Sequence, residues 1–143
     1  MFQSMLSSFT ERVYALLRIV AGLMWSFHGM QSIFHLYYPP PPVPPPPETW
    51  SQLWFGGLIE LTCGLAIAFG IFASPAAFLA SGTMAVAYMQ FHWKFQFDSQ
   101  LLPGVNQGEP ALLYAFLFLF FACKGAGKWS VDSWREKRRA QPR

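Results

Sequence analysis

The stretch FGGLIELTCGLAIAFGIFAS, residues Phe55 to Ser74, decides the fold of this chain. It is an apolar run of membrane-spanning length that carries a single carboxylate, Glu60. Because hydrocarbon makes an ionised carboxylate costly, such a residue usually faces protein or water and marks a site. The competing interpretation places Glu60 near the membrane interface, where its side chain reaches water. The stretch therefore predicts a transmembrane helix with an acid built into it.

Small residues recur around this acid at every fourth position. Gly56, Glu60, Gly64 and Ala68 fall on one face of a helix, where small side chains let a neighbouring backbone come close. Other apolar runs repeat the spacing, with Gly22, Ser26 and Met30 in one and Ala77, Ser81 and Ala85 in another. The pattern predicts helices that pack closely along small-residue seams.

The composition excludes an ordinary soluble domain. Hydrophobic residues make up 53% of the 143 residues and charged residues only 12%, against about 25% charged in a typical soluble domain. Seven of the ten Lys and Arg residues lie between Lys124 and Arg143. A short basic tail beside a membrane segment is typical of cytoplasmic anchoring, and no folded basic module remains to bind nucleic acid.

The apolar runs predict helices at about residues 13–34, 53–73, 75–93 and 108–124. We therefore predict an all-α fold, an antiparallel four-transmembrane-helix bundle in a single domain (1–143) with a short cytoplasmic amphipathic tail. The last run, Ala111 to Cys123, is short for a full span. Either that helix extends through Gly108 and Lys124, or the loop before it dips into the protein.

A proline-rich loop, residues 39–47, follows the first predicted helix. Such a run favours polyproline II, and it is either a rigid solvent-side connector or a ligand for a groove-type partner domain. The loop between the first two helices has no Lys or Arg, and the loop between the last two has only Lys94. The positive-inside rule then predicts a multi-pass protein of the bacterial inner membrane with both termini cytoplasmic and the proline loop external.

In this topology each helix contributes one ionisable group to the outer half of the membrane. We predict a polar site made of His28, Glu60, His92 and Glu109, with Arg18 and Asn106 as secondary residues. A proton relay, a quinone headgroup site and a hydrogen-bonded cluster that fixes helix register all remain open. A metal site is not predicted, because no two of these residues have the helical spacing of a chelating pair. Arg18 is expected to be an interface anchor or an ion-pair partner.

An ordered set of short motifs runs along the chain between Val13 and Asp132. Its first half contains Leu17-Arg18-Ile19, His28-Gly29, Gly57-Leu58-Ile59-Glu60-Leu61, Gly64, Gly70 and Pro75. Its second half contains His92, Asn106-Gln107-Gly108-Glu109 and the run from Gly125 to Asp132. This set resembles the DoxX family of small four-helix bacterial membrane proteins. The chain departs from the family pattern at Ser32, Gln107 and Ala126, where Lys, Gly and Pro are common, and the proline run resembles an insertion.

The resemblance implies a membrane subunit associated with oxidoreductase complexes, and some relatives are linked to thiosulfate–quinone electron transfer. We expect an accessory subunit of a redox membrane complex that contributes a quinone or proton site, holds no intrinsic cofactor and contacts lipid and other redox subunits. The alternative is a non-catalytic scaffold that binds lipid, pigment or protein. A free-standing enzyme is not expected, because the sequence has no nucleophile constellation, phosphate loop or cofactor motif.

Overall fold

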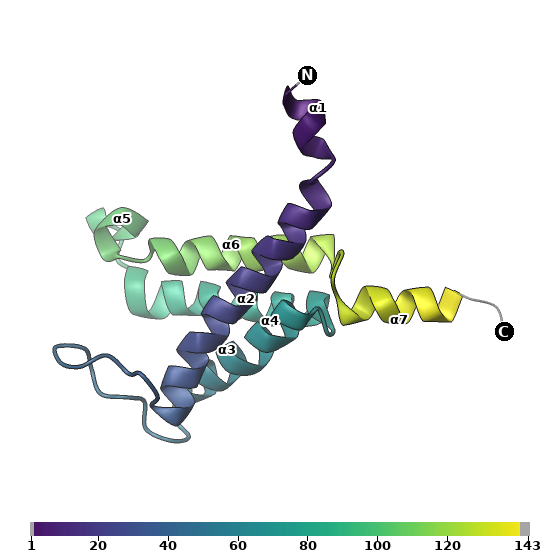
Figure 1. Ribbon diagram of the computed structural model, residues 1–143. Helices are drawn as coiled ribbons and strands as arrows, with labels where there is room; N and C mark the ends of the chain where they lie inside the picture. Colours follow the sequence, from purple (N-terminus) through teal and green to yellow (C-terminus); the bar gives the residue numbers. More distant parts are fainter. Residues whose placement is uncertain (1, 141–143) are drawn as a thin grey trace.

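The computed structural model describes residues 2–140, and over that range the chain is all helical, as the sequence predicts. Its α-helices are α1 (Phe2–Ser7), α2 (Thr10–Phe34), α3 (Gln52–Phe69), α4 (Ala73–Ala87), α5 (Pro103–Asn106), α6 (Glu109–Lys124) and α7 (Val131–Ala140). A π-helix, Tyr88–Trp93, continues α4, and a 3₁₀ turn, Ser99–Leu101, precedes α5. Figure 1 shows α2, α3, α4 and α6 packed together, with α7 projecting from one end.

Helix α3 ends four residues earlier than the predicted boundary at residue 73. Its carboxyl end is closed by Gly70 in the left-handed conformation (φ 65°), whose N–H bonds back to Ala66 and Ile67. Its amino end is capped by Ser51, whose side chain accepts a hydrogen bond from the Trp54 N–H. The turn after Gly70 leads directly into α4, so α3 and α4 are antiparallel neighbours.

The closest helix packing joins α2 and α3. A Cβ atom placed on Gly29 would lie 2.3 Å from the Leu61 nitrogen and 2.5 Å from the Gly57 oxygen. Gly22 meets the backbones of Gly64 and Ala68 in the same way, at 2.7 Å. The predicted seam is therefore present at Gly22, Gly64 and Ala68, but part of its register was wrong.

The seam uses Gly57 and Gly29 where the four-residue spacing pointed to Gly56 and Met30. A Cβ atom on Gly56 would meet nothing within 4 Å. The physical reason is the helical period of about 3.6 residues, which shifts a contact row from every fourth to every third residue along a long interface.

A second pair, α4 and α6, completes the core. Ala77 and Ala80 of α4 are fully buried, and the Ser81 hydroxyl donates a hydrogen bond to the Ala115 carbonyl oxygen of α6 (2.7 Å). Phe118 of α6 is also fully buried, and its ring centroid lies 4.8 Å from that of Trp25 on α2. This aromatic contact joins the two helix pairs at the centre of the molecule.

The start of α2 and the end of α6 lie at the same end of the molecule. Glu11 and Lys124 form an ion pair with an N–O distance of 2.6 Å. One turn further along α2, the Tyr14 hydroxyl donates a hydrogen bond to the carbonyl oxygen of Gly125. The amino end of α2 and the carboxyl end of α6 are thus joined directly.

Two helices in the described range, α2 with 25 residues and α3 with 18, are long and apolar enough to span a membrane. An apolar stripe also lies on the outside of α2, where a soluble protein would place polar side chains. The stripe follows helical spacing and consists of the exposed residues Val13, Leu17, Val20, Met24 and Phe27. An outward-facing stripe of this kind is typical of contact with lipid.

The other two predicted spans are shorter than a standard transmembrane helix of about 20 residues. Helix α4 has 15 residues and continues for six more as the π-helix, while α6 has 16. Helix α6 begins at Glu109, and the segment before it folds into α5, which contacts the π-helix. Four membrane spans therefore stay a prediction.

The proline-rich loop does not form one straight rod. The Val43 N–H bonds to the Pro40 carbonyl oxygen at 3.4 Å, and the Tyr38 hydroxyl reaches the Pro45 carbonyl oxygen at 3.4 Å. The loop therefore turns back on itself beside the ends of α2 and α3, where Figure 1 shows it as a long excursion. A turn and local hydrogen bonds thus interrupt the polyproline II conformation, and the roles as rigid connector or partner ligand stay predictions.

We expect Gly29→Ala to lower the free energy of unfolding by about 1–3 kcal/mol, since the added methyl group overlaps backbone atoms of α3 that cannot move aside. Thermal unfolding in detergent, followed by circular dichroism, measures the effect. Gly56→Ala is the matched control, because its new methyl group enters open space and alanine has the higher helix propensity. Equal unfolding temperatures for the two variants would contradict the packing seam.

Candidate functional site

A cavity of about 390 Å³ opens at the end of the molecule where α2 ends and α6 begins. Helices α2, α3, α4 and α6, the π-helix and the proline-rich loop all contribute to its wall. Its lining residues are Trp25, His28, Gln31, Ser32, Tyr38, Pro39, Val43, Glu60, Met84, His92, Gln107, Pro110, Ala111 and Tyr114. We call this cavity the polar pocket.

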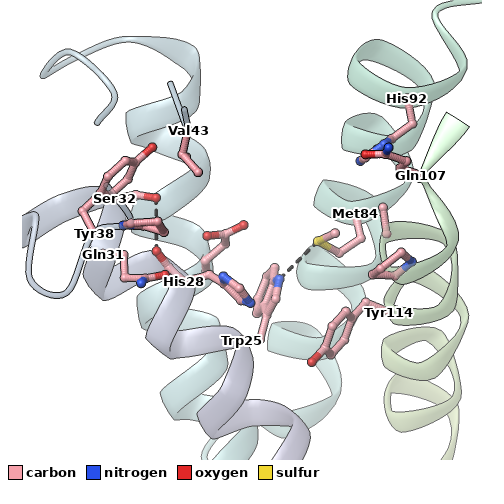
Figure 2. A pocket seen from close by; sticks show the side chains of 14 residues that line it. Trp25, His28, Gln31, Ser32, Tyr38, Val43, Met84, His92, Gln107 and Tyr114 are labelled. Carbon is pink, nitrogen blue, oxygen red and sulfur yellow. Dashed lines mark hydrogen bonds between the residues drawn. The ribbon is translucent and has the colours of Figure 1, made fainter. Parts of the chain in front are cut away.

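Three of the four residues of the predicted site line the polar pocket. His28 comes from α2, Glu60 from α3 and His92 from the π-helix. In Figure 2, His28 lies on the wall that also carries Trp25 and Ser32, and His92 lies with Gln107 on the opposite wall. Residues far apart in sequence thus meet around one space.

Glu109 does not line the polar pocket. It lies in the first turn of α6, with a carboxylate oxygen near Gly104, and it borders a separate apolar groove between α2 and α6. The next residue, Pro110, faces the polar pocket and this groove alike. Successive helical residues point about 100° apart, so a shared depth in the bundle does not give a shared direction.

The Glu60 carboxylate has unused hydrogen-bonding capacity. Glu60 is half-buried, and within residues 2–140 its side chain takes part in no hydrogen bond or ion pair. The His28 imidazole is likewise without a hydrogen-bond partner in that range. An ionisable group that is unpaired in an apolar setting is available to a ligand.

Trp25 and Tyr114 form the aromatic floor of the pocket. Trp25 is 1% exposed, and its indole Nε1–H donates to the Met84 sulfur at 3.1 Å, as Figure 2 shows. Tyr114 lines the same cavity and stacks on Phe118, with ring centroids 5.3 Å apart. A planar ligand can pack on such rings while its polar atoms meet the ionisable groups above.

His92 is held in place by the loop before α6. Its Nδ1 lies 3.2 Å from the carbonyl oxygen of Asn106, and its ring stacks on Tyr88 with a centroid separation of 6.4 Å. The other ring nitrogen is unpaired within the described residues. The π-helical turn carries this side chain, and π-helical segments frequently occur at functional sites.

Asn106 organises that loop. Its side-chain nitrogen donates to the Gln100 carbonyl oxygen at 2.8 Å, and its side-chain oxygen accepts from the Gly108 N–H at 2.7 Å. Asn106 therefore acts on the pocket through His92, and it is not itself a lining residue of the cavity.

Arg18 lies far from the polar pocket, at the opposite end of the molecule. It is 0% exposed, so it is not an anchor that reaches the surface. Its guanidinium donates to the carbonyl oxygens of Ile67, Ala68 (2.7 Å), Trp129 (2.8 Å) and Lys128 (3.3 Å), and within the described residues it forms no ion pair. Its Nε–H is buried without a partner.

At the same end of the molecule, Asp132 caps the start of α4, a contact that was not predicted from the sequence. The Asp132 carboxylate accepts hydrogen bonds from the N–H groups of Phe72 (3.0 Å) and Ala73 (2.9 Å), at the start of α4. The Asp132 N–H in turn donates to the Gly70 carbonyl oxygen at 2.9 Å. Asp132 is the last residue of the motif that begins at Gly125. No local sequence pattern indicates that it caps a helix whose start, Phe72, lies sixty positions earlier.

The lining residues that the sequence did not single out are mostly apolar or aromatic. The sequence predicts core or lipid-facing positions for Trp25, Met84 and Tyr114. Only the packing of the helices shows that these residues line the cavity. Among the described residues, no group of three or more His, Cys, Asp or Glu is placed to hold a metal ion.

The model of the DoxX family matches residues 13–93, which include His28, Glu60 and His92. The chain belongs to the DoxX family. An uncharacterized protein of Haemophilus influenzae is 34% identical over 120 residues, which are 83% of this chain and 87% of the Haemophilus chain. No solved structure matches the chain. The DoxX family is a family of small membrane proteins, in agreement with the apolar helices α2 and α3.

We expect Arg18→Met to lower the free energy of unfolding by about 3 kcal/mol, because buried carbonyl oxygens lose a charged donor. The segment around Lys128 should also detach from α3, so tryptic cleavage after Lys128 should become faster in detergent. Arg12→Met is the matched control, since Arg12 is an exposed arginine on the same helix. Equal unfolding temperatures and cleavage rates for the two variants would refute this role of Arg18.

Proposed function

We propose that this DoxX protein is an accessory subunit of a redox membrane complex and that its polar pocket receives a quinone headgroup. The unpaired His28 and Glu60 side chains, in one cavity with His92, carry the proposal. A quinone ring fits the aromatic floor, and its carbonyl oxygens can accept hydrogen bonds from an imidazole N–H or the Tyr114 hydroxyl.

The chemistry of a quinone explains why such groups are useful. Reduction to the quinol adds one electron and one proton at each carbonyl oxygen. Imidazoles and a carboxylic acid can supply protons at these positions. The chain has no cofactor-binding motif, so the electrons would come from a partner subunit, and the role of this chain is to bind the ring and deliver protons.

The proposal includes a membrane topology. Helices α2 and α3 are long enough to span, and α4 with its π-helical extension and α6 would supply the third and fourth spans. The ion pair between Glu11 and Lys124 joins the start of α2 to the end of α6. The first helix therefore begins on the side where the last helix ends, which agrees with an even number of spans. The basic tail then lies in the cytoplasm of a bacterium, and the polar pocket opens toward the outer side of the inner membrane.

A second candidate function is a non-catalytic scaffold. It is favoured by the bulky apolar side chains that face outward from every long helix, such as Leu58 on α3, Phe78 on α4 and Phe116 on α6. Such surfaces suit lipid, pigment or another membrane subunit. Purification in mild detergent tests the scaffold: a chain that migrates alone as a monomer, with no co-purifying subunit or pigment, argues against it.

Quinone binding can be measured on the purified full-length chain in detergent. We expect a short-chain benzoquinone to quench the fluorescence of Trp25, and a Trp25→Phe variant identifies that part of the signal. Glu60→Ala and His28→Ala should each weaken binding by about fivefold to tenfold, since a lost hydrogen bond costs about 1 kcal/mol.

Glu109→Ala is the matched control for this experiment. It removes the same functional group from the same end of the molecule but lies outside the polar pocket. Equal affinities of the Glu60→Ala and Glu109→Ala variants would exclude the pocket as the binding site. In a reconstituted complex, Glu60→Gln and His92→Ala should lower the rate of quinone reduction, and unchanged activity would remove the proton-delivery role.

A further inference from the structure

A second hollow lies at the other end of the molecule, where α7 leaves the helical core. It has a volume of about 570 Å³ and is almost entirely apolar. Its walls are Ile19 and Leu23 of α2, Ala68 and Phe69 of α3, Trp129 and Ser130 just before α7, and Val131 and Trp134 in α7. We call this hollow the tail groove.

The tail groove is a fixed feature because α7 is tied to the core. Arg18 holds the carbonyl oxygens of Lys128 and Trp129, and Asp132 caps the start of α4. Ser130 is buried against Gly70. These contacts set the two tryptophan rings opposite the apolar face of α2 and α3.

Basic side chains of α7 lie near this groove without lining it. The guanidinium carbon of Arg138 lies 3.9 Å from the centre of the Trp134 ring, and that of Arg135 lies 5.6 Å from the centre of the Phe72 ring. Trp134 lines the groove and Phe72 follows its lining residue Phe69 by three positions, so both guanidinium groups are held on aromatic rings near the groove. Helix α7 also carries basic residues in its last turn: Lys137, Arg138 and Arg139.

The side chains at the groove change from apolar to charged from the middle of α2 toward α7. Leu23 lies one helical turn deeper in α2 than Ile19, the two tryptophans follow at the end of the core, and Arg138 lies beyond them. This order matches that of a phospholipid: acyl chain, interface and headgroup. Phe69, Trp129 and Trp134 each expose more than half of their surface, so the groove is open to a ligand.

We propose that the tail groove is a binding site for an anionic phospholipid. One acyl chain lies against Leu23, Ile19 and Phe69, and the phosphate group meets Arg135 and Arg138. Guanidinium groups bind phosphate through charge-assisted hydrogen bonds. Charge complementarity then favours an anionic over a zwitterionic headgroup, because the ammonium group of a zwitterionic headgroup cancels its net charge and is repelled by the basic residues of α7. An acidic protein segment would match the charge of α7 but would leave the apolar groove without an occupant.

The test uses the full chain in mild detergent, mixed with equal amounts of phosphatidylglycerol and phosphatidylcholine that carry the same acyl chains. Native mass spectrometry counts the retained lipids. The wild-type protein should retain phosphatidylglycerol in preference to phosphatidylcholine. Arg135→Gln/Arg138→Gln should reduce that preference by about 25-fold, because each of the two basic residues near an anionic headgroup contributes roughly a fivefold gain in affinity.

Lys137→Gln/Arg139→Gln is the matched control, since it removes the same charge from the same helix without touching the rings beside the groove. An equal loss in this control would show diffuse attraction to α7 and overturn the site. Leu23→Trp, which fills the groove from an exposed position, should lower retention of both lipids, and unchanged retention would overturn the acyl-chain contact.

A wild-type protein with no preference for phosphatidylglycerol would overturn the proposal and favour an acidic protein partner for α7. The outcome is independent of quinone binding, because the tail groove and the polar pocket share no lining residue. Circular dichroism of each variant shows whether the helices remain intact.

Discussion

The close approach of α2 to α3 is the constraint on which the rest of the structure depends. Gly29 and Gly22 let the backbones meet without intervening side chains, and a single added methyl group would overlap main-chain atoms. In hydrocarbon, helices gain nothing from the hydrophobic effect, so such packing supplies much of the association energy. The same contact brings His28 and Glu60 into the wall of one cavity.

The two ends of the molecule are built differently. At one end, Arg18 and Asp132 join helix termini through hydrogen bonds to the backbone, and both are satisfied within the protein except for the Arg18 Nε–H. At the other end, His28 and Glu60 are left without such partners in the described range. Polar side chains whose hydrogen bonds are satisfied within the protein stabilise the fold. Polar side chains without such partners are the ones that can bind a ligand. The contrast is the basis for placing the proposed quinone site in the polar pocket and a structural role at Arg18.

The sequence was informative wherever the signal was local. The apolar run around Glu60, the small-residue spacing and the motif order predicted an all-helical DoxX protein, and the family match confirms the membership. The sequence also indicates how deep each residue lies along its helix, and this depth places His28, Glu60 and His92 at a similar level. The sequence does not indicate as well toward which neighbour a side chain points. Glu109 was therefore predicted to belong to the polar site, although it faces another groove.

Composition and helical period by themselves determined that this chain forms apolar helices, and they predicted His28, Glu60, His92 and Glu109 toward one end of them. Only the tertiary structure decided which of those groups share a cavity, that Arg18 binds carbonyl oxygens of α3 and of the segment before α7, and that the proline loop borders the polar pocket. The reason is physical. Helix formation depends on neighbours within a few residues, whereas the rotation and crossing of packed helices depend on contacts between residues far apart in the chain.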